Sequence, residues 1–403
     1  MLSEKTIEIV KSTVPILEKH GTKITKVFYQ KMFSNHPELL NIFNHANQKK
    51  GRQPTALFNS VYAAAKHIDN LETILPVVKQ IGHKHRSLGV KAEQYPIVGK
   101  HLLLALKEVL GDEASDDVID AWKEAYDVIA DVFIQVEEEM YQEAENQPGG
   151  WRYFRDFTVV KKVKESDVIT SFYLKPADGG LLPPFKPGQY ISVKLDIEGE
   201  TYTHIRQYSL SDKPGKDYYR ISVKREDECE PVGIVSTYLH EHVKEGDTLP
   251  ISAPAGDFYL DATTDPLVLI SGGVGITPMM SMLHSVVAEQ PERKVTFIHA
   301  ARNGNVQAFR DEIEQIVKEH PTVEYYRVFS DPTEEDLKCE SFDKKGYIDL
   351  EWLQSVVKDT VAQFYFCGPV PFMKSVHASL KQLGVPKERI HYEFFGPALV
   401  LAE

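Results

Sequence analysis

Cysteine is scarce in this sequence, and a long apolar run is absent. The three cysteines, Cys229, Cys339 and Cys367, are too few and too scattered for a disulfide framework or a tetrahedral zinc cluster. No apolar stretch approaches the roughly 20 residues that a membrane span needs, and no basic segment followed by an apolar one opens the chain. We therefore expect a cytoplasmic protein without a membrane span.

Basic residues are also in deficit. The chain has 46 Lys and Arg against 59 Asp and Glu, which gives a net charge of −13. An acidic surface repels phosphate backbones, so nucleic acid is not an expected partner. Apolar residues make up 42% of the chain, as in ordinary globular proteins. A length of 403 residues suggests two or three domains.

Glycine and proline are few in the first third of the chain. Of the 24 glycines and 23 prolines, 11 lie in residues 1–147 and 36 in residues 148–403. The change falls at Pro148-Gly149-Gly150, which we interpret as a linker. A second change, from alternating sequence to strand followed by helix, comes near Pro266. The predicted domains are residues 1–147, 148–262 and 263–403.

The three segments have different hydrophobic periods. In residues 1–147 apolar residues recur every three or four positions, which predicts about seven helices. From Trp151 the period is two, with Gly and Pro turns, which predicts an antiparallel β-barrel. From Leu267 strands and helices alternate, which predicts a doubly wound α/β domain with a parallel sheet. The expected fold is therefore multidomain, with one all-α, one antiparallel β and one α/β part.

A glycine-rich turn follows the first strand of the third segment. It reads Gly273-Val274-Gly275-Ile276-Thr277-Pro278 and precedes a helix expected from about Met279. Such a turn lets backbone N–H groups approach a diphosphate, which the helix N-terminus also attracts. An ordinary tight turn is the alternative, because the spacing is not Gly-x-Gly-x-x-Gly. The next strand ends at Arg302 instead of an acidic residue, so the choice between NADH and NADPH stays open.

Two further motifs flank this turn. Arg206-Gln207-Tyr208-Ser209 lies upstream, and Phe366-Cys367-Gly368-Pro369 lies downstream. Together, the three motifs resemble the ferredoxin-reductase-type module that binds FAD and NAD(P). Arg206 offers a cationic fork for the flavin diphosphate, while Tyr208 and Ser209 can contact the flavin ring. The resemblance also implies flavin contacts from Tyr190 and from the C-terminal run Glu393-Phe394-Phe395-Gly396-Pro397.

One histidine of the helical segment lies on an apolar helix face. His85 shares that face with Val78 and Ile81. An imidazole in an apolar helical pocket is what a haem iron requires, although a satisfied core histidine gives the same pattern. A second face carries Gln53 one turn before Leu57. Gln53 is either a hydrogen-bond donor above a ligand or a glutamine that points to solvent.

Residues 1–147 resemble a globin. The motifs that carry this resemblance are Lys84-His85, the run from Glu93 to His101, Tyr29, Phe43, and Gln53 with Leu57. A globin joined to FAD-binding and NAD(P)-binding domains in about 400 residues is the architecture of the flavohemoglobin family, and the resemblance covers the whole chain.

The resemblance implies roles for these residues. His85 would bind the iron of one haem b per chain, with Tyr95 and Glu137 supporting the imidazole and Glu138 and Glu139 facing outward. Tyr29 would donate a hydrogen bond to dioxygen. The other residues implied in the haem site are Gln53 and Leu57 on the distal side, Phe43 against the haem, and Lys84 near the junction of haem and flavin.

The implied activity is that of a nitric oxide dioxygenase. Nitric oxide and O2 would become nitrate at a haem iron that NAD(P)H re-reduces through FAD, because FAD takes up hydride and passes on single electrons. One alternative is a general NAD(P)H-flavin diaphorase or ferric reductase that carries a globin. Another is a sensor or carrier of oxygen or nitric oxide. The distal pocket could also admit a lipid or an imidazole-type ligand, for which no motif argues, and a monomer is expected.

Overall fold

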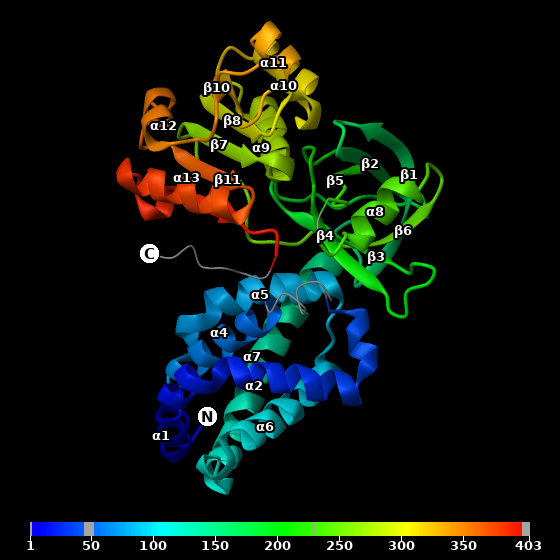
Figure 1. The fold of residues 1–403 in the computed structure, drawn as a ribbon. Coiled ribbons are helices and arrows are strands. Elements are labelled where there is room, and N and C mark those ends of the chain that lie inside the picture. Colours follow the sequence, from blue (N-terminus) through cyan, green and yellow to red (C-terminus); the bar gives the residue numbers. More distant parts are fainter. Residues whose placement is uncertain (1, 44–51, 229, 397–403) are drawn as a thin grey trace.

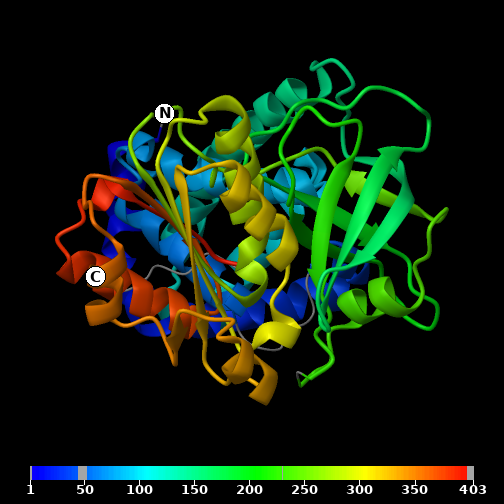
Figure 2. The ribbon, with the colours of Figure 1, turned by 90° about the horizontal axis from the view of Figure 1, so that it is seen from above.

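The computed structural model describes residues 2–43, 52–228 and 230–396, and these form three bodies in chain order (Figure 1). A helical domain comes first, an antiparallel β-domain second and an α/β domain third. Seen from above, the β-domain and the α/β domain lie side by side over the helical domain (Figure 2). Among the described residues, each helix is too short or too polar to cross a membrane.

The described part of the first domain contains six α-helices, against about seven expected for the whole of residues 1–147. They are α1 (Glu4–Ser12), α2 (Val14–Asn35), α4 (Arg52–Lys66), α5 (Leu75–Leu88), α6 (Tyr95–Leu110) and α7 (Asp116–Glu145). Local signals explain their ends. The Ser115 side chain caps α7 by accepting a hydrogen bond from Val118 N. Helix α5 has Pro76 in its first turn, and Gly89, whose φ of 76° suits glycine, caps its C-terminal end.

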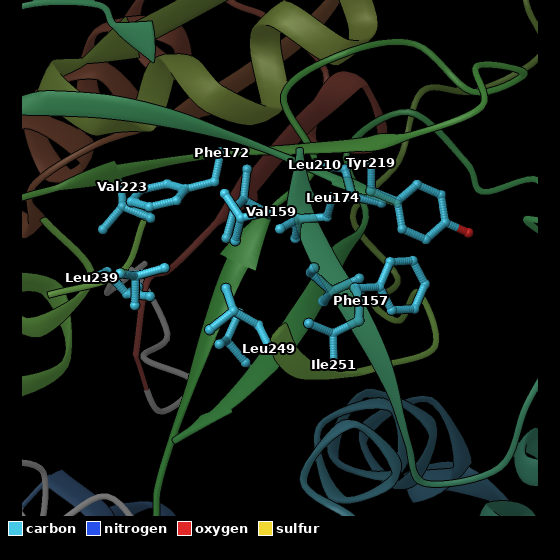
Figure 3. Close-up of a cluster of buried hydrophobic side chains, with 14 of the residues drawn as sticks. Phe157, Val159, Phe172, Leu174, Leu210, Tyr219, Val223, Leu239, Leu249 and Ile251 are labelled. Carbon is cyan, nitrogen blue, oxygen red and sulfur yellow. The ribbon is translucent and has the colours of Figure 1, made fainter. Parts of the chain in front are cut away.

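The second domain is a six-stranded antiparallel sheet with the order β4-β3-β6-β1-β2-β5. Its elements are β1 (Phe154–Lys164), β2 (Ile169–Pro176), β3 (Tyr190–Leu195), β4 (His204–Ser209), β5 (Tyr219–Lys224), α8 (Ile234–Glu241) and β6 (Thr248–Ser252). An isolated bridge between Leu210 and Ile221 joins the two ends of the sheet, which makes it barrel-like. Alternate residues of the strands fill the interior, among them Phe157, Phe172 and Ile251 (Figure 3).

The third domain is a parallel sheet with the order β10-β9-β8-β7-β11-β12 and apolar clusters on both faces. Its strands are β7 (Leu267–Gly272), β8 (Val295–Ala301), β9 (Val323–Phe329), β10 (Lys344–Lys345), β11 (Gln363–Cys367) and β12 (Ile390–Glu393). Its helices are α9 (Ile276–Glu289), α10 (Arg310–Glu319), α11 (Glu334–Cys339), α12 (Leu350–Val356) and α13 (Val370–Gln382). The strand order reverses between β7 and β11, and ligands of such sheets bind at that point.

Helix α9 begins at Ile276, three residues before the predicted start near Met279. Pro278 lies in its first turn, where the N–H that proline lacks would have no helical partner. The glycine turn therefore leads directly into the helix N-terminus.

Candidate functional site

One side of the helical domain contains a cluster of three polar side chains, two of them buried. His85 on α5 places Nδ1 2.7 Å from Oε1 of Glu137 on α7. The hydroxyl of Tyr95, at the start of α6, donates to the same oxygen at 2.6 Å and lies 3.2 Å from His85 Nδ1. Glu137 is 3% exposed and Tyr95 is 9% exposed, whereas the His85 side chain is 34% exposed. The imidazole is therefore held at one nitrogen and open elsewhere.

Tyr95 is fixed in this cluster as a hydrogen-bond donor. Burial, together with the charge of Glu137, raises the pKa of the Tyr95 hydroxyl, so this hydroxyl stays protonated. The Tyr126 hydroxyl donates to the Tyr95 carbonyl at 2.7 Å and anchors the start of α6. Glu138, one residue after Glu137, instead pairs with Arg152 near the start of the second domain, and Glu139 is exposed. The helix thus turns one of three consecutive carboxylates inward.

Aromatic rings cluster around Tyr29 in the helical domain. Tyr29 on α2 is 7% exposed, and its ring centre lies 5.6 Å from that of Phe33 and 5.8 Å from that of Phe43. Leu57 on α4 is partly buried against the same apolar cluster. Gln53 lies at the start of α4, and its side chain is outside the described residues.

The donor chemistry of the helical domain fits a haem. A haem-binding histidine offers one nitrogen to the iron and donates from the other to a carboxylate or carbonyl. In His85 the carboxylate of Glu137 engages Nδ1, so Nε2 is the nitrogen that could hold a metal. Helix α5 also brings Lys84 next to His85, and Lys84 Nζ donates to the Gly396 carbonyl at 3.0 Å. The C-terminal segment therefore reaches the helix that carries the candidate ligand.

The flavin motif lies on two paired strands of the β-domain. Tyr190 on β3 pairs with Ser209 on β4, and Ile191 pairs with Tyr208. Gln207 Nε2 donates to Ser192 Oγ at 3.3 Å, which orders the strand pair. Burial raises the pKa of both the Tyr190 and the Tyr208 hydroxyl, so both stay neutral.

Arg206 fits a flavin diphosphate. Within the described part of the chain, its guanidinium forms no ion pair and donates to one acceptor, the Ile205 carbonyl at 2.8 Å. Burial lowers the pKa of Arg206, because the cation is removed from water without a counter-charge. A bound diphosphate would supply that charge and accept from the remaining N–H groups.

The glycine turn packs against the end of the neighbouring strand β11. A Cβ at Gly275 would lie 2.2 Å from the Cys367 carbonyl oxygen, so only glycine fits there. Gly273 has a φ of 54°, and Val274 accepts a hydrogen bond from Thr277 Oγ1 at 3.1 Å. Ile276 and Pro278 are buried in the first turn of α9. Gly368 follows Cys367 directly, and a Cβ there would meet the ring of Phe372 at 2.6 Å.

The last strand brings an acidic group to this edge of the sheet. Glu393 on β12 pairs in register with the buried Cys367 on β11. Burial, reinforced by the nearby Asp257 charge, raises the pKa of Glu393 to about 8, although Lys84 acts in the opposite direction. Phe394 is partly buried and Phe395 is 47% exposed. Of the predicted C-terminal contacts, Gly396 lies against Lys84, and Pro397 is outside the described residues.

Sequence reasoning missed Arg86 and Asp257. Arg86 is 6% exposed, and its guanidinium donates to the Pro254 carbonyl, which joins the helical domain to the β-domain. Asp257 lies near enough to Glu393 to raise its pKa. Their partners are 168 and 136 positions away in the chain. No helical or strand period carries a signal over such a separation.

Three families match the chain in order. A globin family matches residues 26–133, an oxidoreductase FAD-binding domain matches 156–259, and an oxidoreductase NAD-binding domain matches 269–378. Among curated relatives, the flavohemoprotein of Bacillus thuringiensis is 64% identical over 403 residues, and that of Bacillus subtilis is 56% identical over 404. In both comparisons the alignment covers 100% of each chain.

Two solved structures extend the comparison. A flavohemoglobin from Malassezia yamatoensis with bound FAD and haem is 29% identical, with a TM-score of 0.85, over 98% of this chain and 100% of that one. The FAD/NAD-binding domain of a nitric oxide dioxygenase from Vibrio cholerae is 41% identical, with a TM-score of 0.56. That alignment covers 60% of this chain and 99% of the other.

Proposed function

We propose that this chain, which belongs to the flavohemoprotein family, is a nitric oxide dioxygenase supplied with electrons by NAD(P)H. The observation that carries the proposal is the contact between Lys84, next to the candidate iron ligand, and Gly396, three residues after the flavin-side Glu393. It links an imidazole held by a carboxylate with a flavin and nucleotide module in one chain. We also infer a cytoplasmic location, because cysteine is scarce and Cys339 is free and exposed.

The cofactors supply the redox chemistry. When bound, FAD accepts hydride from NAD(P)H and passes single electrons to haem, at whose iron nitric oxide and dioxygen become nitrate. His85 would hold the iron through Nε2, while Glu137 accepts from Nδ1 at 2.7 Å. That hydrogen bond fixes the tautomer and orientation of the ring and raises the basicity of the ligand. Tyr95 would keep the Glu137 carboxylate in place through its 2.6 Å hydrogen bond.

The distal residues would handle the gaseous substrates. The Tyr29 hydroxyl would donate a hydrogen bond to dioxygen, and Phe43 and Leu57 would keep the surrounding space apolar. Gln53 is a second candidate donor on this side. An apolar site with one or two donors favours small neutral gases over charged substrates.

The other half of the chain would bind the electron donors. Arg206 would hold the flavin diphosphate, and Tyr190, Gln207, Tyr208 and Ser209 would line the flavin. The turn Gly273–Gly275 and the N-terminus of α9 would receive the nucleotide diphosphate. Cys367, Gly368 and the segment Glu393–Gly396 would surround the site where nicotinamide meets flavin.

The test is nitrate formation by the purified holoprotein with NADH, O2 and nitric oxide. We expect two nitrate ions for each NADH oxidised, because NADH carries two electrons and each turnover consumes one. The matched variant His85→Ala should lose the haem Soret band and nitrate formation, yet keep flavin absorbance and reduction of an artificial acceptor.

Each alternative gives a different result in this test. A sensor or carrier would form negligible nitrate with NADH. A diaphorase or ferric reductase would oxidise NADH in this assay equally fast with and without His85→Ala, and neither protein would form nitrate. Either result contradicts the proposal, and replacing NADH with NADPH in the same assay decides between the two nucleotides.

A further inference from the structure

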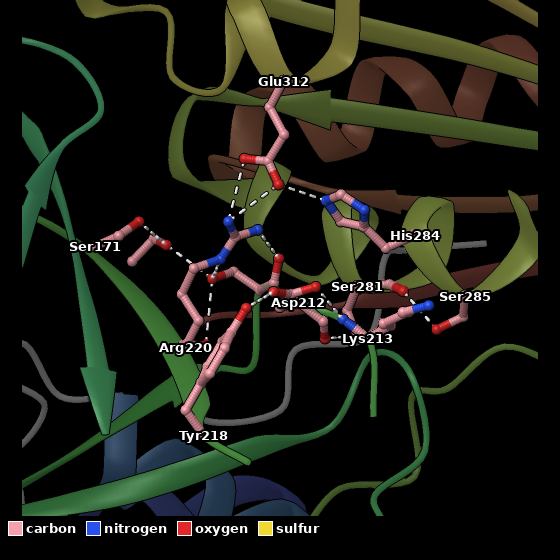
Figure 4. A network of polar contacts seen from close by, with 11 residues as sticks. Ser171, Asp212, Lys213, Tyr218, Arg220, Ser281, His284, Ser285 and Glu312 are labelled. Atoms are coloured by element: carbon pink, nitrogen blue, oxygen red, sulfur yellow. Dashed lines mark hydrogen bonds and ion pairs between the residues drawn. The ribbon is translucent and has the colours of Figure 1, made fainter. Parts of the chain in front are cut away.

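A network of charged side chains joins the β-domain to the α/β domain (Figure 4). Arg220 on β5 donates from Nη1 to both carboxylate oxygens of Glu312 on α10, at 3.0 and 3.1 Å. His284 on α9 donates from Nε2 to Glu312 at 2.5 Å. At the domain boundary Arg220 is 3% exposed, whereas the Glu312 side chain is 29% exposed, so the guanidinium is buried and the carboxylate is partly open to solvent. One carboxylate therefore ties two helices of one domain to a strand of the other.

The β-domain holds Arg220 rigidly from its own side. Arg220 Nε donates to Ser211 Oγ at 3.2 Å, and Nη2 donates to the Ser211 carbonyl at 2.5 Å. The neighbouring Asp212 accepts from the Tyr218 hydroxyl at 2.7 Å. A fork fixed at three nitrogens has one orientation, so it can define where Glu312 must lie.

The same network touches the segments of both candidate cofactor sites. Ser211 and Asp212 follow the flavin motif, which ends at Ser209. Ser281 on α9 donates to the Asp212 carbonyl at 2.8 Å. Helix α9 begins directly after the glycine turn, so Ser281 and His284 lie within three turns of it. A shift of α9 relative to Asp212 would therefore move the nucleotide turn relative to the flavin strands.

The ion pair persists at neutral pH. Burial alone would raise the pKa of Glu312, but the hydrogen bond from His284 and the charge of Arg220 lower it overall. The carboxylate stays ionised beside a guanidinium that is always charged. Removing Glu312 takes away the carboxylate that is hydrogen-bonded to the buried Arg220 and leaves only the nearby charge of Asp212, so the contact is sensitive to substitution.

We propose that Arg220, Glu312 and His284 form an interdomain clamp that positions the nucleotide site for hydride transfer to the flavin. The inference rests on the proposed function. The three side chains are positioning residues, because they act through α9 and the strand end after Ser209. Misplacement of reacting groups by about 1 Å can cost about a hundredfold in rate. The clamp should therefore control hydride transfer and leave the later electron transfer to haem unchanged.

The test is rapid anaerobic mixing of the full holoprotein with NADH, without nitric oxide. In Glu312→Gln, which keeps the shape of the side chain, the limiting rate of flavin reduction should fall at least tenfold. The NADH concentration that gives the half-maximal rate should change less than threefold. The rate of electron transfer from flavin to haem, measured after photoreduction of the flavin, should also change less than threefold. FAD and haem content should equal those of the parent. Arg220→Lys, which keeps the charge but loses the fork, should give an intermediate rate.

The control variant is Glu314→Gln on the same helix. Glu314 pairs with Arg310 at 3.0 Å and with Arg327 at 3.7 Å, both within the α/β domain. It should reduce flavin at the parental rate.

An unchanged rate of flavin reduction in Glu312→Gln would overturn the clamp. The clamp would also be overturned if Glu312→Gln slowed flavin-to-haem electron transfer as much as flavin reduction, or if Glu314→Gln slowed flavin reduction as much as Glu312→Gln does. If Glu312→Gln loses FAD or fails to fold, His284→Ala decides. It removes the hydrogen bond from α9 to Glu312 and keeps the ion pair with Arg220, and a parental rate of flavin reduction there contradicts the inference. A parent that reduces flavin and haem normally yet forms no nitrate contradicts the proposed function alone.

Discussion

Replacement of Glu137 by glutamine removes a negative charge from the proximal cluster with little change in shape. Glu137 Oε1 receives two hydrogen bonds, from His85 Nδ1 at 2.7 Å and from the Tyr95 hydroxyl at 2.6 Å. Glutamine can still accept through its carbonyl oxygen. The imidazole should therefore keep its orientation but lose the charge that makes its other nitrogen a strong donor to iron.

The size of the effect follows from the two hydrogen bonds. Charge-assisted bonds contribute about 1.5–3 kcal/mol each, and neutral ones about 0.5–1.5 kcal/mol. Neutralising the acceptor of both should cost about 1–3 kcal/mol of the free energy with which the ligand supports the iron, which is roughly a 5- to 150-fold change in affinity or rate. Substitutions next to metal-binding histidines elsewhere cost about 10–100-fold in affinity or activity. We expect Glu137→Gln to lower NADH-dependent nitrate formation by about tenfold or more and to raise the haem reduction potential.

The assay compares Glu137→Gln with Glu139→Gln, which lies on the same helix and is exposed. Nitrate formation, the haem potential and the Soret band are measured for both variants. The control should behave like the parent in all three. If Glu137→Gln also keeps parental turnover and potential, the carboxylate does not tune the ligand, and its role is confined to packing.

Three further substitutions test other parts of the site. Tyr29→Phe removes the distal hydroxyl and should speed dioxygen release about fivefold, which corresponds to the loss of one hydrogen bond. Flash photolysis measures the release rate, and an unchanged rate would exclude Tyr29 as a hydrogen-bond donor to dioxygen. Gly275→Ala forces a Cβ against the Cys367 carbonyl and should raise the KM for NADH about tenfold while the Soret band is kept. An unchanged KM would contradict the close packing of the glycine turn against β11. Glu393, with its pKa raised to about 8 from an ordinary 4.5, holds a proton in the folded chain that the unfolded chain has lost. The stability that the protonated Glu393 contributes is therefore lost as pH rises from the unfolded to the folded pKa. The Tm of Glu393→Gln should accordingly rise relative to that of the parent between about pH 5 and about pH 9. A difference in Tm that does not depend on pH would contradict the burial of this carboxyl.

The fold class could be predicted because each domain has its own hydrophobic pattern: helical in the first, alternating in the second, and buried strands followed by helices in the third. Alternation at Phe157 and Val159 buries both side chains completely inside the β-domain. The run Leu267–Gly272 is buried on both faces, as a central parallel strand requires. The sequence places the start of α9 three residues too late, because the helix runs through Thr277 and Pro278, which resemble a turn in sequence.

The site was predictable only in part. Spacing placed His85 on an apolar helix face, but its partner Glu137 lies 52 positions away, and only the family resemblance singled it out from its neighbours. The contacts that join domains, such as Arg86 with Pro254 and Arg220 with Glu312, connect residues 168 and 92 positions apart. Such pairs depend on how domains pack together, and local periodicity does not encode that arrangement.

The central claim is that electrons pass from NADH through FAD to a haem held by His85 within this single chain. The most direct measurement is the visible spectrum of the purified protein during anaerobic addition of NADH. The account predicts flavin and haem bands together at the start, loss of the oxidised flavin band, and then a shift of the Soret band as the iron is reduced. Flavin that bleaches while the haem stays ferric, or a protein without a Soret band, would contradict it.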